Sequence, residues 1–240
     1  MNYKYGKFSK LPSNAGPTLG EIQYNITFAQ LAHLENKEIL DFGAGFGLVS
    51  NFLSQKNKVT AVEPNADMLF ADDSQTFTKL QGSLEVLESF ADETFDIIYC
   101  HNVMEYISPQ EHQAYFDHFR RLLKAGGQLS IIKHNPVGKV LQAVVFSNDT
   151  KLAQDLLNGK EFHSQSVAQG STYSIEYLLQ WSQMSLENYL AIRTFYSLQP
   201  NEFKTEDGWL EKMTEIELAV ADQKPYKDIS FLQHVWLRKE

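Results

Sequence analysis

The sequence predicts an α/β fold, a doubly wound and mostly parallel sheet of seven strands with an insertion after strand five. Three observations predict it. Short apolar runs alternate with helix-like segments, a glycine-rich turn at 43–47 follows the first run, and Glu63 ends the second run. Strands that alternate with helices at this spacing indicate parallel strands joined by right-handed crossovers.

The elements follow from the apolar periodicity and the turn residues between them. Strands are expected at 38–42, 58–63, 77–80, 95–100, 128–134, 186–198 and 229–239. Helices are expected at 21–34, 46–55, 66–71, 108–123, 140–146, 150–157, 175–181 and 206–221. Asn65 and Ser174 are expected as helix caps, Ser108 with Glu111 reads as a capping box, and Gly126–Gly127 is expected to end that helix. The chain is interpreted as one domain, 1–240, with an N-terminal cap segment at 1–36 and an insertion at 136–173 over the acceptor site.

The glycine turn indicates a nucleoside-bearing cofactor. Gly43, Gly45 and Gly47 tolerate positive φ and let the backbone approach a ligand, and Asp41 precedes them at the strand end. Glu63 is placed to accept from both ribose hydroxyls. The spacing is not the G-x-G-x-x-G of a dinucleotide site, and no phosphate-binding lysine follows. A purely structural turn, a nicotinamide-dependent oxidoreductase and a non-catalytic binding module remain alternatives.

The segments I-L-D-F-G-A-G-F-G at 39–47 and V-T-A-V-E-P-N-A-D-M-L at 59–69 resemble class I S-adenosylmethionine-dependent methyltransferases. The resemblance implies a Rossmann-like sheet that ends in an antiparallel strand pair, with S-adenosylmethionine as cofactor. It places Asp41 and the turn backbone at the methionine part, Glu63 at the ribose, and Ser83 where an aspartate usually meets the adenine. The expected cofactor residues are Asp41, Gly43, Ala44, Gly45, Glu63, Pro64, Ser83, Leu84 and His101.

A more specific resemblance is to the bacterial tRNA 5-carboxymethoxyuridine methyltransferases, which esterify a wobble-uridine carboxylate. It is carried by the segments 100–107, 134–138, 192–195 and 217–239. The chain departs from that group at Gln23, where the group has an arginine, and at 159–166, where a lysine-rich stretch is replaced by one lysine and a glutamate. The acceptor is therefore expected to be tRNA or a small metabolite with a carboxylate or hydroxyl.

His101 and Arg193 are the expected catalytic residues. A hydroxyl acceptor needs a general base and a carboxylate does not, and His101 and His134 both end strands at the edge where ligands bind. Each histidine has the alternative of a hydrogen-bonded structural role. Arg193 lies in an apolar stretch, so it pairs with a structural acid or reaches an anionic acceptor. The remaining candidates are pocket or core aromatics and a buried thiol: Tyr173, Tyr177, Trp181 and Cys100.

Composition bounds the function further. The 240 residues carry a formal net charge of −9, which disfavours broad non-specific binding to nucleic acid. The one cysteine excludes an internal disulfide, and no metal is expected. No apolar run is long enough to span a membrane, and 1–7 lacks the apolar core of a signal peptide, so a cytoplasmic enzyme is expected. The sequence leaves the oligomeric state open.

Overall fold

The fold is built on one seven-stranded sheet, as the sequence predicts, and its strand order is β3-β2-β1-β4-β5-β9-β8. The computed structural model describes residues 18–160, 162–163, 169–204 and 206–240, so residues 1–17 of the cap segment expected at 1–36 lie outside the described residues. β3, β2, β1, β4 and β5 are parallel, and β9 runs antiparallel to β5 and β8. The strands are β1 (Glu38–Phe42), β2 (Lys58–Glu63), β3 (Thr78–Gln81), β4 (Phe95–His101), β5 (Leu123–His134), β8 (Ser185–Ile192) and β9 (Leu232–Arg238).

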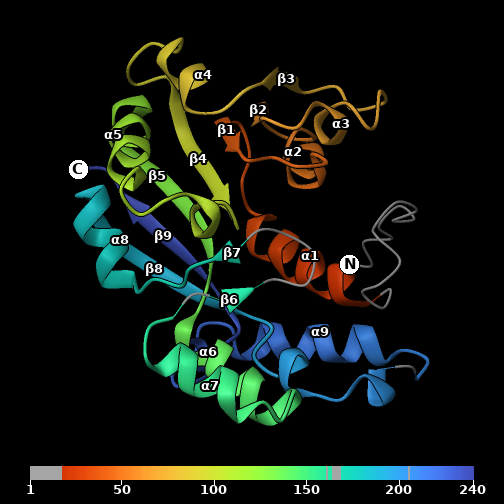
Figure 1. Ribbon diagram of the computed structural model, residues 1–240. Helices are drawn as coiled ribbons and strands as arrows, with labels where there is room; N and C mark the ends of the chain where they lie inside the picture. The colour runs from red at the N-terminus through yellow and green to blue at the C-terminus, as the bar shows by residue number, and fades with distance from the viewer. Residues whose placement is uncertain (1–17, 161, 164–168, 205) are drawn as a thin grey trace.

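Helices cover both faces of the sheet (Figure 1). The cofactor half contains α1 (Thr18–Leu31), α2 (Leu48–Leu53), α3 (Ala66–Leu69), α4 (Leu84–Glu88), η1 (Met104–Tyr106) and α5 (His112–Leu122). The second half contains α6 (Pro136–Leu141), the π-helical η2 (Gln142–Phe146), α7 (Thr150–Leu157), α8 (Ile175–Ser182), η3 (Tyr196–Leu198), η4 (Asn201–Lys204), α9 (Trp209–Val220) and α10 (Tyr226–Ile229). A separate pair, β6 (Phe162–His163) and β7 (Gln169–Gly170), lies within the insertion.

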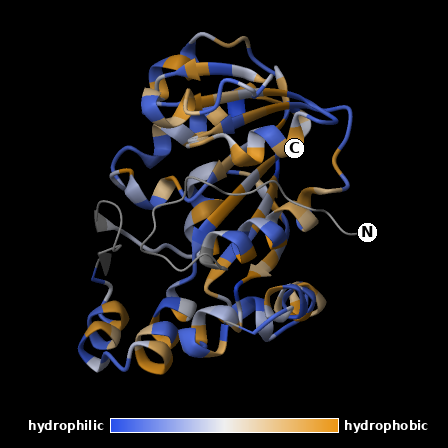
Figure 2. Cartoon of the chain, turned by 90° about the vertical axis from the view of Figure 1, so that its right-hand side faces the viewer, coloured by the Kyte–Doolittle hydropathy of each residue, from blue (hydrophilic) through white to orange (hydrophobic). Residues whose placement is uncertain are grey.

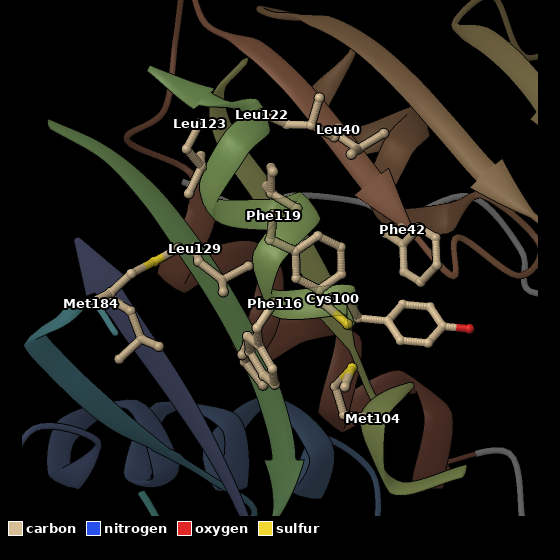
Figure 3. Packing of buried hydrophobic residues seen from close by; sticks show 14 of the residues in the cluster. Leu40, Phe42, Cys100, Met104, Phe116, Phe119, Leu122, Leu123, Leu129 and Met184 are labelled. Atoms are coloured by element: carbon tan, nitrogen blue, oxygen red, sulfur yellow. The ribbon is translucent and has the colours of Figure 1, made fainter. Parts of the chain in front are cut away.

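Each strand divides its side chains between two cores, because successive residues point to opposite faces. Leu40 and Phe42 pack with Phe116 and Phe119 of α5 on one face (Figure 3). Ile39 packs on the other face with residues of α1, α2 and α3. The strands in the middle of the molecule are accordingly mostly hydrophobic (Figure 2). Asp41 shares the face of Ile39, so its carboxylate lies on the α1 and α2 side.

The predicted capping box is wrong. Helix α5 begins at His112 with Glu111 as its N-cap residue, and the Ser108 hydroxyl bonds the Gln110 side chain instead of a helix N–H. Gly126–Gly127 does not end a helix either, since both lie within β5, where the Gly126 N–H donates to the Lys239 carbonyl at 3.0 Å. The caps at Asn65 and Ser174 are confirmed by side-chain oxygens that accept from helix N–H groups.

Strand β8 ends at Ile192, six residues before the predicted end at 198, and the cause is a buried carboxylate. The backbone N–H groups of residues 194, 195 and 196 donate to Glu217 of α9 at 2.7, 2.9 and 2.8 Å. Those groups are therefore unavailable to a neighbouring strand, and the chain turns into η3. Strand β9 likewise begins at Leu232, because residues 226–229 form α10.

Among the described residues, no helix combines the length and apolarity that a bilayer crossing would require.

Candidate functional site

A pocket of about 180 Å³ lies at the carboxyl ends of β1 and β4. In doubly wound sheets this edge is where ligands bind. Five of the predicted cofactor residues line the pocket: Asp41, Gly43, Ala44, Gly45 and His101. Its remaining wall comes from α1, the glycine turn, α2, Met68, the residue after β4 and β5: Gln23, Tyr24, Thr27, Phe46, Leu48, Val49, Met68, Asn102 and Ile132. Four predicted residues lie outside this lining: Glu63, Pro64, Ser83 and Leu84.

The glycine turn is folded back tightly onto β2. The N–H groups of Gly43 and Ala44 both donate to the Val62 carbonyl, at 2.8 and 3.1 Å. Gly43 has φ +77, and a Cβ there would lie 2.2 Å from Cγ2 of Val103. Only glycine meets both conditions, so part of the motif serves the packing of the turn as well as the approach of a ligand.

Glu63 holds this turn in place. Its side chain is buried, with Oε2 accepting from the Gly45 N–H at 3.0 Å and Oε1 accepting from the Asn65 N–H at 2.9 Å. One carboxylate therefore connects the turn after β1 to the cap of α3. A carboxylate has about four lone-pair positions, so two remain for further donors such as ribose hydroxyls.

Asp41 is a buried carboxylate next to the same turn. It is 3% exposed and accepts from the Ser50 hydroxyl at 2.6 Å. The pKa of the Asp41 carboxyl is raised to about 6, chiefly by burial, while the Ser50 hydrogen bond opposes this rise and the negative charge of Glu63 contributes to it. An ionised carboxylate in such a place is costly unless a cation pairs with it. The α-ammonium group of a bound methionine moiety would supply that charge.

The segment after β3 lies beside Glu63, as the adenine assignment requires. The Gly82 N–H donates to the Glu63 carbonyl at 3.2 Å, and the Ser83 N–H donates to Glu85 at 2.8 Å. The Ser83 hydroxyl lies 3.3 Å from the Tyr115 hydroxyl. Tyr115 comes from α5 and has no signal in the local sequence. The roles of Ser83 and Leu84 at the adenine remain predictions.

His101 combines a hydrogen-bonded ring with a place in the pocket wall. Its Nε2 lies 2.9 Å from the Ser130 hydroxyl, while its Nδ1 has no hydrogen-bond partner in the part of the chain that the structure describes. Burial lowers the pKa of the His101 imidazole well below its usual range, and the neighbouring His234 adds to this. The ring is therefore neutral at physiological pH.

Arg193 follows β8 directly, rather than lying inside the predicted strand. It is 6% exposed, and its φ of +63 is unusual for a residue with a side chain. The guanidinium carbon lies 4.6 Å from the ring centre of Phe231 and 5.5 Å from that of Tyr196. Its Nη1 donates to Oε1 of Gln23 at 3.1 Å, and its Nε is unpartnered among the described residues.

Other cations gather on the same two rings. Lys139 Nζ lies 5.0 Å from the Phe231 ring centre, and Lys204 Nζ lies 4.0 Å from that of Tyr196. Lys139, Arg193 and Lys204 are called the cation cluster below. Burial and the charge of Arg193 lower the pKa of both lysines to about 8, and burial lowers the pKa of Arg193 to about 10.

Two glutamates lie near the cation cluster. Glu217 accepts the three backbone N–H groups after β8. Glu105 accepts from the His134 N–H at 2.8 Å, and burial raises the pKa of the Glu105 carboxyl to about 7. Burial together with Lys139, Arg193 and Lys133 lowers the pKa of His134 well below its usual range. The second half of the site is thus rich in buried positive charge.

Gln23 connects the two halves. It lines the cofactor pocket and also accepts from Arg193. It thus contacts one predicted catalytic residue, Arg193, and lines the same pocket as the other, His101. The sequence comparison treats Gln23 only as a missing arginine, and its place between the sites was not anticipated.

Two of the three aromatic candidates belong to the core. Tyr173 is buried, and Trp181 packs on His112, Phe116 and Tyr173 with ring centres 4.5, 6.1 and 5.9 Å away. The third, Tyr177, is 53% exposed. Cys100 is fully buried, and burial raises the pKa of its thiol well above the usual range. The positions of Tyr173, Trp181 and Cys100 agree with the structural interpretation of these residues, whereas Tyr177 lies outside the core.

Comparisons with known proteins agree with this geometry. Residues 40–131 match the family model described as a methyltransferase domain. No curated protein matches the chain. A solved protein of Pyrococcus horikoshii OT3 is similar at 14% identity and TM-score 0.58, over 95% of this chain and 93% of that one. A SAM-dependent methyltransferase of Methanosarcina mazei is similar at 14% identity and TM-score 0.57, over 88% and 96% of the two chains.

A third similar structure is the 1,6-didemethyltoxoflavin-N1-methyltransferase of Burkholderia thailandensis, solved with its substrate and S-adenosylhomocysteine. It has 15% identity and TM-score 0.54, over 91% of this chain and 77% of that one. At these identities the solved structures show the fold alone. The family match covers β1 to β5 up to residue 131 and every predicted cofactor residue. The buried Asp41, the glycine turn and the open Nδ1 of His101 fit S-adenosylmethionine. Residues 40–131 of the chain thus match a methyltransferase domain, on a fold shared with solved S-adenosylmethionine-dependent methyltransferases.

Proposed function

We propose that this enzyme methylates a carboxylate oxygen of its acceptor. The observation that supports this is the cation cluster, which lies next to the cofactor pocket and is joined to it through Gln23. The insertion at 136–173 contributes to this region through Lys139 of α6 and through Phe146 of η2, whose ring centre lies 5.2 Å from Lys204 Nζ. It is therefore proposed to cover the acceptor.

The three cations of the cluster outnumber the two nearby carboxylates, Glu105 and Glu217. Buried cations lose their hydration, and Arg193 lies close enough to Lys139 and Lys204 to lower the pKa of both. A bound carboxylate offsets these penalties and accepts hydrogen bonds from a guanidinium in a planar, two-pronged geometry. A neutral hydroxyl compound offers no such compensation.

The chemistry suits this acceptor. When bound, S-adenosylmethionine supplies a methyl group activated by a positively charged sulfur. A carboxylate oxygen is already a nucleophile, so no general base is needed, and the protein contributes mainly by holding the acceptor in line. Arg193 would orient the carboxylate, and the rings of Phe231 and Tyr196 would exclude water from its surroundings. His101 is then a binding residue rather than a base.

The first acceptor to test is the wobble carboxymethoxyuridine of tRNA, because the strand-four exit and the segments 134–138 and 192–195 resemble enzymes that esterify it. A small metabolite acid is the alternative. It is favoured by the net charge of −9 and by glutamine at position 23. A nicotinamide-dependent reaction is not proposed, since the family match is to a methyltransferase domain.

The experiment measures transfer of labelled methyl from S-adenosylmethionine to tRNA lacking the ester and to a panel of small carboxylic acids, each paired with its primary alcohol. A methyl ester is expected, which mild alkali cleaves with release of labelled methanol. A base-stable product, or transfer to the alcohols alone, would contradict the proposal. Activity that survives high salt would assign the acceptor to the metabolites, because phosphate-driven binding weakens with salt.

Variants test the role of the cluster. Arg193→Met is expected to lower kcat/KM for the carboxylate acceptor by about 10- to 100-fold, the worth of a hydrogen bond to a charged group. The matched control is Arg238→Met, at the opposite end of β9 from Phe231. Both variants should bind S-adenosylhomocysteine within about twofold of the natural chain. An equal loss in both variants would exclude a specific role for Arg193.

A further inference from the structure

Four side chains form one continuous hydrogen-bonded path from α1 to the cofactor pocket. His234 Nδ1 lies 2.7 Å from Gln30 Oε1, and His234 Nε2 lies 2.7 Å from the Ser130 hydroxyl. The Ser130 hydroxyl in turn lies 2.9 Å from His101 Nε2. Gln30, His234, Ser130 and His101 are called the polar path below. Its middle members, Ser130 and His234, are both 0% exposed.

The direction of every hydrogen bond in the polar path follows from its outer end. The Gln30 amide nitrogen donates to the Ala191 carbonyl at 3.0 Å, which leaves Oε1 to face His234. His234 Nδ1 must therefore donate. Burial lowers the pKa of His234 to about 3, so the ring is neutral and its Nε2 is an acceptor.

The directions of the hydrogen bonds at Ser130 and His101 are then fixed. The Ser130 hydroxyl has a single proton and donates it to His234, so its oxygen accepts from His101. His101 Nε2 consequently carries the ring proton. His101 is also neutral, and its Nδ1 is left with an open lone pair. A reversed arrangement would set the Gln30 oxygen against the Ala191 carbonyl.

The sheet positions His101 near Asp41. Asp41 of β1 pairs in register with Tyr99 of β4, and His101 lies two residues further along β4 on the same face. Both residues line the cofactor pocket. Asp41 offers a buried carboxylate as a hydrogen-bond acceptor, and His101 offers a neutral nitrogen.

We propose that the polar path holds His101 in the tautomer with its proton on Nε2, so that Nδ1 accepts a hydrogen bond from the α-ammonium group of the cofactor. An ammonium has three N–H donors, which Asp41 alone does not satisfy in a pocket shielded from water. Gln30, Ser130 and His234 are then positioning residues. The inference depends on the cofactor and not on the identity of the acceptor.

The test compares the binding of S-adenosylhomocysteine with that of its analogue in which hydrogen replaces the amino group, by titration calorimetry without any acceptor. In the natural chain, removal of the amino group should weaken binding by about 10- to 100-fold. In Ser130→Ala that ratio should fall by about fivefold, because His101 no longer has a fixed tautomer. Ser130→Thr, which keeps the hydroxyl, should restore it.

Two further variants separate this effect from a loss of packing. Ser182→Ala removes another buried hydroxyl, on α8 away from the pocket, and should leave the ratio unchanged. Gln30→Met breaks the outer end of the polar path and should lower the ratio as Ser130→Ala does. It therefore provides the test if Ser130→Ala fails to fold.

Nitrogen-15 NMR of labelled histidine reads the tautomer directly. The natural chain should show the His101 proton on Nε2, and Ser130→Ala should show a mixture. A proton on Nδ1 in the natural chain would overturn the inference. An amino-group ratio that stays constant in both Ser130→Ala and Gln30→Met would overturn it as well. Neither result would affect the proposed carboxylate acceptor.

Discussion

Two turns at the edge of the sheet are each held by a buried glutamate that accepts backbone hydrogen bonds, but the two turns differ in backbone conformation and in the charges around them. In the cofactor half, Glu63 accepts the N–H groups of Gly45 and Asn65 and fixes the turn after β1. In the acceptor half, Glu217 accepts three consecutive N–H groups and fixes the turn after β8. The first turn is made of glycines, whereas the second begins at Arg193, held at φ +63.

The difference concerns charge as well as backbone. The cofactor half contains the buried carboxylates Asp41 and Glu63, which we expect to face a ligand that carries an ammonium and a sulfonium. The acceptor half presents Arg193, Lys139 and Lys204, and we assign it to an anion. Gln23 lines the pocket beside Asp41 and also bonds Arg193, so the proposed transfer from a cationic cofactor to an anionic acceptor would be matched by protein charge at both ends.

Removing Glu217 should have the largest effect on stability. Glu217→Ala leaves the N–H groups of residues 194–196 without their acceptor and Arg193 without a nearby negative charge. We expect the free energy of unfolding to fall by about 3–5 kcal/mol. Urea unfolding measures this, and calorimetry should show near-normal S-adenosylhomocysteine affinity in the folded fraction. Lost cofactor affinity with unchanged stability would contradict the division into two halves.

Gly43→Ala is the corresponding change in the cofactor half. The added Cβ meets Val103 at 2.2 Å and the residue must keep φ +77, so we expect a loss of about 2–4 kcal/mol together with weakened cofactor binding. Gly208→Ala is the control, since Gly208 has φ +74 but nothing within 4 Å. It should cost about 1–2 kcal/mol. Equal losses at both positions would show that packing against Val103 is unimportant.

Glu63→Ala should weaken S-adenosylhomocysteine binding by about tenfold or more, because it removes both the ribose acceptor and the support of Gly45. Glu63→Gln keeps one side-chain oxygen for the Gly45 N–H and should lose less. Calorimetry measures both. If the alanine variant retains full affinity, Glu63 does not belong to the cofactor site.

Acid should weaken cofactor binding through Asp41. Its carboxyl pKa is raised from 3.8 to about 6, so it becomes neutral below that pH and loses its attraction for an ammonium. S-adenosylhomocysteine affinity should then fall by up to about tenfold per pH unit. In the cofactor-free protein the same raised pKa makes the free energy of unfolding decrease as pH rises from 3.8 to about 6. Asp41→Asn should lack both trends.

The smallest expected effect concerns the helix caps. Ser174 accepts from the Tyr177 N–H, so Ser174→Ala should cost about 1 kcal/mol of unfolding free energy. Ser108 caps no helix, and Ser108→Ala should change the free energy of unfolding by less than about 0.5 kcal/mol. If thermal unfolding showed a larger loss of stability in Ser108→Ala than in Ser174→Ala, the capping box at Ser108 would be supported after all.

The contrast between the two turns also explains what could be predicted from the sequence. The cofactor half is encoded locally, with Asp41, the glycines and Glu63 inside one βαβ unit, and residues 39–63 therefore indicate both the fold and the cofactor. The end of β8 depends instead on Glu217, which lies 23 residues beyond Thr194. No local pattern predicts that contact, and the apolar run through Arg193 therefore indicates a continuing strand.

The same limit applies to the site. Asp41 and His101 were expected near the cofactor from the strand ends that carry them. Ser130, His234 and Gln30 were not, because a hydrogen-bonded path between β5, β9 and α1 exists only once the sheet order is known. The cluster of Lys139 and Lys204 around Arg193 was missed for the same reason, since the three cations come from α6, η4 and the end of β8.

The position of β9 has a consequence for synthesis on the ribosome. Strand β9 is the last strand in sequence, yet it lies between β5 and β8 and pairs with both. Residues 185–192 therefore have no partner in the sheet until residues 232–238 have left the exit tunnel. The parallel part around the glycine turn is complete in the chain long before that moment. The nascent protein passes through a stage in which the cofactor half is able to fold while the acceptor half waits for its central strand.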